Sequence, residues 1–228
     1  MKKIFFDYST KLDSGLFCLL SKKNSRTHNL SLGKQREVFI NHLGAEMDKI
    51  AFPVQTHSSN VLYIEKGGEY DNVDGLITRK KNIVLSIQVA DCVPVFIYDI
   101  KNQVKGLIHS GWRGAADKII SNAIKLFLKI GSTPQDIKVV IGPSIRKCCY
   151  EVGTELVELF DNTCIELLDS KLKLDISSQI KLDLKKFKIP EINIFDSNIC
   201  TYCNLECHSY RRERTGARMI ALLGNIYD

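Results

Sequence analysis

Three residues of reactive type, His57, Cys92 and His109, each stand where an apolar run meets a loop. Cys92 directly precedes the run VPVFIYD, and His109 ends the run QVKGLIH. Two imidazoles and one thiolate can bind a metal in tetrahedral geometry with the fourth position open to water, which is the layout of a catalytic zinc site. Such a metal would lower the pKa of its bound water toward about 7, and it would supply hydroxide or polarise a leaving group.

The spacing of these residues does not by itself identify a metal site. The three lie far apart in the sequence and fit no local finger pattern, so composition alone favours a structural role for each. Without a metal, Cys92 and His109 would form a cysteine nucleophile with a histidine base, as in a thiol hydrolase or deamidase. Asp91 is the nearest candidate acid or base, and a turn carboxylate that accepts backbone N–H bonds is an equally good interpretation of it.

Arg113 is the first candidate for binding an anionic substrate. It lies in the turn SGWRG, and the apolar residues that recur from Ala116 to Leu128 have the spacing of an amphipathic helix. Free amides and the helix dipole favour an anion at a helix N-terminus, and the Arg113 guanidinium would strengthen such a site. Arg211 and Arg212, in the only dense basic block of the chain, are candidates for the same role.

Length and composition indicate a globular chain. With 228 residues, 44% of them hydrophobic, it can bury a sizeable core, and we expect a single domain over residues 1–228. No apolar run approaches the roughly 20 residues of a membrane span, and the N-terminal apolar stretch is too short for a signal peptide, so we expect a cytoplasmic protein without membrane contact. The net charge is +6, but scattered lysines do not form the basic stripe of a nucleic-acid binder. We therefore expect no nucleic-acid partner. A monomer is expected.

The apolar patterning predicts consecutive strands with interspersed helices. Amphipathic helices are predicted at 32–47 and after Gly114, and a further helix begins near Gly153. Strands are predicted at 3–7, 15–20, 61–65, 74–78, 83–89, 93–99, 103–109, 137–142, 192–197 and 219–226. The segment 167–188, of mixed lysine and leucine, shows no clear pattern. This order favours an α+β fold with mixed sheets over strict βαβ alternation.

The eight cysteines indicate free thiols or metal ligands more than disulfides in a chain of this size and expected compartment. Four residues of one short segment resemble a zinc or iron–sulfur box: Cys200, Cys203, Cys207 and His208. Four ligands within so short a segment need very tight local folding, so we interpret them as incidental thiols. The adjacent pair Cys148-Cys149 is interpreted as packing, because neighbouring cysteines rarely ligate one metal together or form an unstrained disulfide.

Six motifs follow one another along the chain: QTHSSNV, VDGLIT, ADCVPVFIYD, HSGWRGAA, IGPSIRKCCYEVG and SYRRERTGARM. With them the chain resembles the laccase-domain family, which was named for polyphenol oxidase and includes the peptidoglycan editing factor of the YfiH type. The likeness runs from Asn29 to the C-terminus, and the combination of ADC with HSGWRG is highly specific.

The resemblance implies a zinc site formed by His57, Cys92 and His109. It also implies phosphorolysis of the purine nucleosides adenosine, inosine and methylthioadenosine, with adenosine deamination alongside and a role in peptidoglycan editing. The implied fold is a layered α/β/β/α arrangement related to cysteine-dependent toxin deamidases. Where the family usually has GPCIGPCCYEV this chain has GPSIRKCCYEV, so the metal ligands carry over but the substrate preference does not.

The laccase name implies copper chemistry. One blue-copper centre would take two histidines and one cysteine, which leaves three of the five histidines for a trinuclear cluster, so multicopper oxidation is not expected. A single copper ion in the zinc ligands stays an alternative, since copper binds nitrogen and sulfur sites more tightly than zinc, and with it a copper-dependent phenol oxidase. A non-catalytic partner-binding protein of cell-wall or redox physiology is a further alternative.

Overall fold

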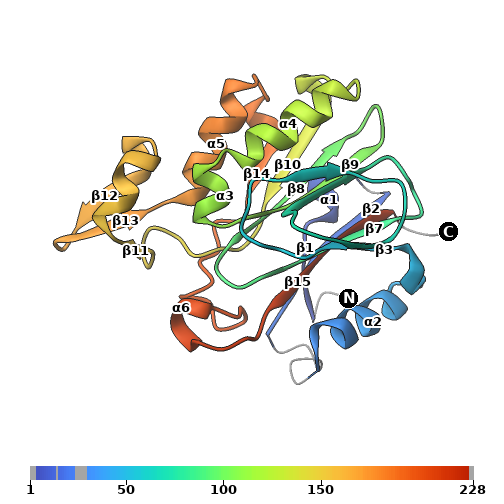
Figure 1. The fold of residues 1–228 in the computed structure, drawn as a ribbon, viewed down its shortest axis with the longest axis horizontal. Coiled ribbons are helices and arrows are strands. Elements are labelled where there is room, and N and C mark those ends of the chain that lie inside the picture. Colours follow the sequence, from blue (N-terminus) through green and yellow to red (C-terminus); the bar gives the residue numbers. More distant parts are fainter. Residues whose placement is uncertain (1–3, 14, 24–29, 226–228) are drawn as a thin grey trace.

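The computed structural model describes residues 4–13, 15–23 and 30–225. Two six-stranded sheets pack face to face, and helices cover the outer face of each (Figure 1). The layers therefore follow the order α/β/β/α, and the predicted α+β fold with mixed sheets is confirmed. Among the described residues, no helix combines the length and the apolar character that crossing a membrane requires.

Both large sheets mix parallel and antiparallel strands. The first consists, in spatial order, of β1 (Phe5–Asp7), β2 (Leu16–Ser21), β15 (Met219–Asn225), β7 (Val84–Val89), β3 (Ile50–Pro53) and β5 (Gly68–Tyr70). The second consists of β14 (Ile194–Asp196), β10 (Ile137–Ile141), β8 (Val93–Asp99), β9 (Val104–Ser110), β6 (Gly75–Thr78) and β4 (Val61–Tyr63). A small third sheet, β11 (Glu151–Val152), β13 (Lys171–Leu174) and β12 (Ile165–Leu168), stands to one side.

The helices divide between the two outer faces. The α-helices are α1 (Ser9–Leu12), α2 (Leu32–His42), α3 (Trp112–Ala116), α4 (Ile119–Lys129), α5 (Ile176–Lys186) and α6 (Tyr210–Glu213). Helices α3, α4 and α5 lie over the second sheet, whereas α2 lies over the first (Figure 1). The short α6 lies in the loop region before β15.

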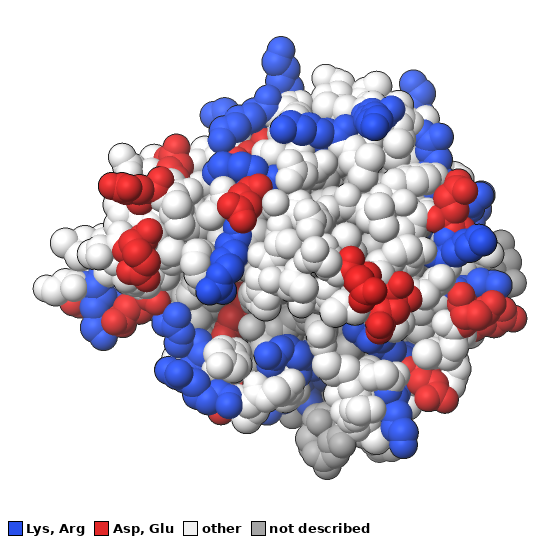
Figure 2. Space-filling view, in the orientation of Figure 1, with Lys and Arg blue, Asp and Glu red and all other residues white. Residues whose placement is uncertain are grey.

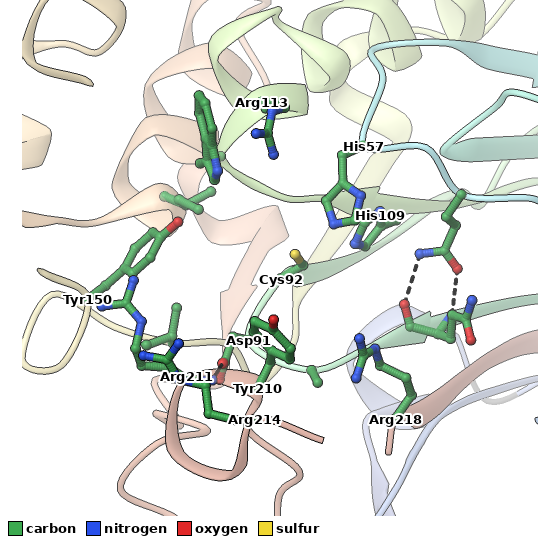
Figure 3. Close-up of a pocket in the computed structure, with 16 residues that line it drawn as sticks. His57, Asp91, Cys92, His109, Arg113, Tyr150, Tyr210, Arg211, Arg214 and Arg218 are labelled. Atoms are coloured by element: carbon green, nitrogen blue, oxygen red, sulfur yellow. Dashed lines mark hydrogen bonds between the residues drawn. The ribbon is translucent and has the colours of Figure 1, made fainter. Parts of the chain in front are cut away.

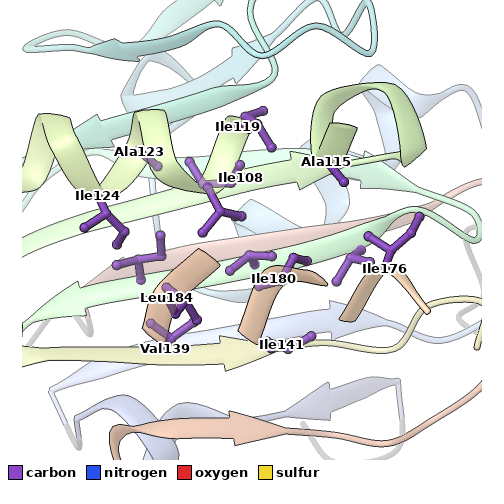
Figure 4. Close-up of a cluster of buried hydrophobic side chains, with 14 of the residues drawn as sticks. Ile108, Ala115, Ile119, Ala123, Ile124, Val139, Ile141, Ile176, Ile180 and Leu184 are labelled. Carbon is purple, nitrogen blue, oxygen red and sulfur yellow. The ribbon is translucent and has the colours of Figure 1, made fainter. Parts of the chain in front are cut away.

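Strand β8 shows how the core is built. Its residues Val95 and Ile97 pack under α4 and α5, in the cluster drawn in Figure 4. The alternate residues Phe96 and Tyr98 point the other way and pack between the two sheets. Because side chains alternate along a strand and both faces of β8 are buried, the strand reads as a continuous apolar run in the sequence.

The predicted helices differ from those observed in their ends. The helix expected after Gly114 is two helices, because Lys118 adopts a left-handed conformation (φ 63°) that separates α3 from α4. The helix expected at 32–47 stops at His42, and Gly44 follows it with a φ of 70°. Near Gly153 the chain forms a short 3-10 helix, Thr154–Leu159, in place of an α-helix.

The segment that showed no pattern, 167–188, is ordered into β12, β13 and α5. Helix α5 begins after Asp175, whose side chain accepts a hydrogen bond from the Ser178 amide and caps the helix. Its buried residues Ile176, Ile180 and Leu184 recur at helical spacing and contact the second sheet. Strands β3, β5 and β11 were also missed by the sequence patterning.

Candidate metal centre and active site

The three residues expected to bind metal do converge. The ligating atoms of His57, Cys92 and His109 all lie within 4.8 Å of one another. The two imidazole rings meet edge to face, with centroids 4.9 Å apart and an angle of 79° between their planes. Figure 3 shows the Cys92 sulfur between these rings and the rest of the cavity.

The pairing of β8 with β9 brings two of these residues together. Val93 pairs with Ser110 and Pro94 pairs with His109, so Cys92, directly before β8, lies beside the end of β9. His57 comes from the loop between β3 and β4. Its backbone is in the left-handed region (φ 61°), which for a residue other than glycine requires support from the surrounding structure.

That support comes from Asp74, a buried carboxylate that the sequence reasoning did not single out. Its oxygens accept hydrogen bonds from the backbone amides of Thr56, His57 and Ser58 and from the Ser58 hydroxyl. They also accept one from Nδ1 of His109, at 2.7 Å. With Nδ1 engaged, the other ring nitrogen of His109, Nε2, remains for a metal or a thiol. Asp74 thus positions both histidines.

A signal for Asp74 was present in the sequence. Gly75 pairs with Ile108 in the antiparallel ladder of β6 and β9, so the residue before Gly75 lies opposite His109. A carboxylate at the start of a strand that pairs with a histidine strand is therefore a candidate to orient that histidine. The pairing of β6 with β9, which is not sequential along the chain, was needed to see it.

The thiol and the imidazole shift each other's protonation. Burial raises the pKa of the Cys92 thiol, but His109 and His57 outweigh this effect and bring its pKa below the usual value. Burial likewise lowers the pKa of His109, and the facing Cys92 and Asp74 bring it above the usual value. The site therefore favours a thiolate at Cys92, which is the form that binds a metal.

The donor set and the space around it fit a zinc ion. Two imidazoles and a thiolate are the ligand types of a catalytic zinc site, and Asp74 supplies the carboxylate partner that zinc-bound histidines usually have. Gly111 has no side chain, and this leaves space for the Cys92 and His57 donors. A Cβ at this position would lie 3.0 Å from the Cys92 Sγ and 3.0 Å from the His57 Cδ2, so a larger residue would push two of the three donors aside.

The three donors open onto a cavity of about 760 Å³. Its size is within the range of small-molecule sites, roughly 300–1,000 Å³. The lining residues are Gln55, His57, Gln88, Ala90, Asp91, Cys92, His109, Trp112, Arg113, Ile145, Tyr150, Ile176, Tyr210, Arg211, Arg214 and Arg218. One part of the wall is held by two reciprocal hydrogen bonds between Gln55 and the Gln88 backbone, the dashed lines of Figure 3.

Four arginines line this cavity: Arg113, Arg211, Arg214 and Arg218. Arg113 stacks on the Trp112 ring, and Arg211 lies over the Tyr150 ring. The last two arginines were not predicted. On the face shown in Figure 2, basic and acidic side chains are interspersed, and basic ones gather over the segment that contains α6.

Of the three arginines predicted to bind substrate, Arg113 and Arg211 line the cavity and Arg212 does not. Arg212 is not among the lining residues, because its guanidinium donates to the backbone oxygens of Thr201, Tyr202 and Cys207 and so holds a loop together. Arg113 does line the cavity, but α3 has only five residues, so the long amphipathic helix expected to begin there is absent.

Asp91 lies beside Cys92 in the cavity wall with both oxygens engaged. One accepts from the Thr201 hydroxyl at 2.6 Å, and the other accepts from the Arg211 backbone amide at 2.7 Å. This arrangement matches the turn carboxylate that was the second interpretation of Asp91. As Asp91 is the one carboxylate among the described lining residues, the cavity carries an excess of positive charge.

The cysteine-rich segment is arranged differently from the expected box. The Sγ atoms of Cys200 and Cys203 lie near those of Cys148 and Cys149, within 4.8 Å of one another. Cys207, which belonged to the expected box, is fully buried and outside this cluster. The interpretation of these thiols as incidental, and of Cys148-Cys149 as packing, stays a prediction, but the structure brings together sulfurs from two distant loops that the sequence spacing did not group.

Comparison with known proteins places the chain in a family. The family described as multi-copper polyphenol oxidoreductase laccase matches residues 23–225. The chain belongs to this family. A purine nucleoside phosphorylase from Clostridium acetobutylicum is 36% identical over 184 residues, 76% of each chain. A protein named adenosine deaminase, from an unknown prokaryotic organism, is 31% identical over 71% of this chain and 68% of its own.

The fold is shared with solved members of the same group. The crystal structure of YlmD from Geobacillus stearothermophilus superimposes with a TM-score of 0.88 at 25% sequence identity, covering 95% of this chain and 94% of that one. The resemblance to the laccase-domain, YfiH-type family is thereby confirmed.

The copper chemistry in the family's description is not matched by the donors present. Among the described residues, two groups could hold a metal: the His57, Cys92 and His109 site and a cluster of four cysteines. A trinuclear copper cluster needs many imidazoles, and the second group contains none. The His57, Cys92 and His109 donors therefore suit one metal with an open position, and the described residues do not supply the imidazoles of a multicopper array.

We expect Gly111→Ala to weaken zinc binding by at least about tenfold, because metal donors must be held within about 0.5 Å of their working geometry. The dissociation constant would be measured by competition with a coloured chelator. Gly33→Ala is the matched control, since a Cβ there meets nothing within 4 Å. Equal zinc affinity in the two variants would show that Gly111 does not reserve space for the site.

A second expectation concerns Asp74. Asp74→Asn removes the negative charge that orients His109 while keeping the shape of the side chain, so zinc affinity should fall by roughly 10- to 100-fold. Isothermal titration of the metal-free protein with zinc measures this loss. A matched buried carboxylate outside the site, Asp99→Asn, should leave zinc affinity unchanged. An Asp74→Asn variant with unaltered affinity would refute the positioning role.

Proposed function

We propose that this protein is a zinc-dependent purine nucleoside phosphorylase that acts on adenosine, inosine and methylthioadenosine and also deaminates adenosine. The observation that carries the proposal is that the His57, Cys92 and His109 donors share one cavity with several arginines. The names of the relatives from Clostridium acetobutylicum and from the unknown prokaryote, a phosphorylase and a deaminase, support the same class of substrate. We also propose that the protein is located in the cytoplasm and is a monomer.

The arginines suit a phosphate ion. Guanidinium groups bind phosphate oxygens through paired, charge-assisted hydrogen bonds, and this geometry favours arginine over lysine. Arg113 and Arg211 are held on the aromatic faces of Trp112 and Tyr150, which orients them at little cost in side-chain freedom. The carboxylate of Asp91 is already engaged, so it does not compete with phosphate for these cations.

The remainder of the wall suits a purine nucleoside. Trp112, Tyr150 and Tyr210 offer aromatic surfaces, while Ile145 and Ile176 add apolar ones. A planar base stacks on such rings with a gain of roughly 1–3 kcal/mol. Gln88 and Gln55 add polar atoms to the wall, where ribose hydroxyls or base edges require partners. The cavity wall therefore combines aromatic and apolar surface for a base with the arginines that would bind phosphate.

In phosphorolysis, an oxygen of phosphate forms a bond to C1′ of the ribose while the bond from C1′ to N9 of the purine breaks. The purine leaves with the bonding electron pair and takes up one proton, and ribose 1-phosphate remains. In deamination, the elements of water replace the amino group at C6, and ammonia leaves. Zinc supplies Lewis-acid chemistry for both reactions when it is bound.

The residues of the chain would hold the reactants in place for these steps. Arg113 and Arg211 would bind phosphate and fix its direction of attack, which lowers the entropic barrier. Asp74 keeps the proton of His109 on Nδ1, so that the lone pair of Nε2 faces the cavity. The apolar side chains beside the base exclude water from the sugar, so that phosphate and not water attacks C1′.

A second candidate function rests on a specific observation. The lowered pKa of Cys92 and the raised pKa of His109 describe a thiolate–imidazolium pair, which is also the machinery of a metal-free cysteine hydrolase or deamidase. In that case the sulfur would attack the substrate and form a covalent intermediate. The two functions differ in their response to chelators and to alkylating agents.

The proposal predicts that the zinc-loaded protein releases hypoxanthine from inosine only when phosphate is present, and that it converts adenosine to inosine without phosphate. Removal of zinc by a chelator should abolish both activities, and added zinc should restore them. Iodoacetamide should modify Cys92 slowly in the loaded protein and rapidly after chelation, because a metal-bound thiolate is a poor nucleophile. Purine release followed by chromatography and peptide mass spectrometry provide the readouts.

The opposite pattern would replace the proposal with the cysteine hydrolase. Activity that survives complete removal of metal but is lost on rapid alkylation of Cys92, or a covalent adduct of Cys92 with substrate, would establish that alternative. Turnover of phenols by a copper-loaded protein, with no release of purine from any nucleoside, would instead favour the phenol oxidase.

Arg113→Lys tests the phosphate site. The variant keeps the positive charge but loses the paired hydrogen bonds, and since a hydrogen bond to a charged group contributes about 1.5–3 kcal/mol, kcat/KM for phosphate should fall roughly 10- to 100-fold. Phosphate-independent deamination of adenosine should change much less. Arg79→Lys, at an exposed position outside the cavity, is the matched control. Unchanged phosphorolysis in Arg113→Lys would move the phosphate site to Arg211, Arg214 and Arg218.

A further inference from the structure

Outside the cavity, four thiols meet at the surface, and we call them the four-thiol cluster: Cys148, Cys149, Cys200 and Cys203. All four are free, and their sulfur atoms lie within 4.8 Å of one another. The Sγ of Cys203 is 3.3 Å from that of Cys149 and 3.9 Å from that of Cys148. Neither the proposed reaction nor the first metal site uses these residues.

The distances fit the edges of a tetrahedron around one metal ion. Four sulfurs bound to zinc at about 2.3 Å lie about 3.8 Å from each other. The two separations given for Cys203, 3.3 and 3.9 Å, lie on either side of this value. A cluster of four iron atoms would hold its thiolates farther apart, because the cluster itself fills the space between them. The geometry therefore suits a single ion.

Backbone contacts hold the two loops of the cluster together. Ser144 and Cys200 form an isolated parallel bridge, with hydrogen bonds from the Thr201 amide to the Ser144 oxygen and from the Ser144 amide to the Ile199 oxygen. These contacts fix Cys200 beside the loop that carries Cys148 and Cys149, so the fold itself brings the four sulfurs together.

We propose that the four-thiol cluster holds a second metal ion, a structural zinc with four sulfur ligands and no open position. Sites closed by four cysteines are structural, whereas catalytic zinc keeps a position for water or substrate. Zinc is favoured over harder cations because thiolates are soft ligands. The assignment does not depend on which reaction the cavity performs.

The position of the cluster indicates what the ion would stabilise. Tyr150, which lines the cavity, directly follows Cys149. Thr201, which directly follows Cys200, donates its hydroxyl proton to Asp91, and its backbone oxygen accepts from Arg212. An ion bound by the cluster would thus cross-link the two loops that carry one wall of the cavity and stabilise their folded arrangement.

Zinc content of four purified proteins tests the proposal: the natural chain, Cys203→Ser, Cys92→Ala and the double variant. The natural chain should contain about two zinc ions, each single variant about one and the double variant about none. X-ray absorption of Cys92→Ala should show zinc surrounded by sulfur alone, at about 2.3 Å. Cys207→Ala, which removes a buried thiol of the same segment, is the matched control and should keep both ions.

Two results would overturn the second site. One is an equal zinc content in the natural chain and Cys203→Ser, and the other is a zinc shell containing nitrogen in Cys92→Ala. An intact mass two hydrogens lower in zinc-free protein, purified without reductant, would assign the cluster to a disulfide instead. If Cys203→Ser does not fold, the absorption spectrum of Cys92→Ala still decides. If only the first site fails to bind zinc, Cys92→Ala and the natural chain will have the same zinc content. The two proposals can therefore fail separately.

Discussion

The hydrogen bonds of the Asp74 carboxylate are the interaction on which the geometry of the candidate metal centre depends. It is fully buried and satisfied by hydrogen bonds from the loop of His57 and from the His109 ring. Burial of a charge without such partners would cost a large desolvation free energy. In this site the partners that offset this cost are the same groups that must be positioned. The left-handed backbone of His57 and the orientation of His109 both follow from this one residue. The pairing of β6 with β9 places Asp74 opposite His109, and the hydrogen bonds of its carboxylate then fix the positions of the two histidine ligands.

The sequence predicted the donors and the class of fold better than it predicted their supports. Cys92 and His109 are adjacent to strongly apolar runs, and these runs are strands buried on both faces, so their ends could be located from hydrophobicity alone. Asp74 could not be found in this way, because its contact with His109 depends on strand pairing that is not sequential. The break at Lys118 was missed because the apolar spacing continues through it.

The same limitation explains why the arrangement of the arginines and cysteines was not predicted. Arg212 was grouped with Arg211 because they are adjacent, but neighbouring residues in a short helix point in different directions, and Arg212 faces the loop carbonyls. Cys148 and Cys203 were assigned to different groups because they are distant in the sequence. The bridge between Ser144 and Cys200 nevertheless places their loops side by side. Local spacing is informative about periodic elements and uninformative about loops that meet through the fold.

The origin of the cavity residues in distant parts of the chain has a consequence for folding. His57, Asp74, Cys92 and His109 come together only after both sheets have formed, and Arg211 joins them from a segment near the C-terminus. A site with such high contact order cannot assemble early as a local unit, so metal uptake should follow the slow collapse of the whole sheet sandwich. Because the three donors open onto the cavity, however, a bound metal could leave through it while both sheets stay folded. Assembly of the donors thus needs the whole fold, whereas exchange of the ion needs only the open cavity.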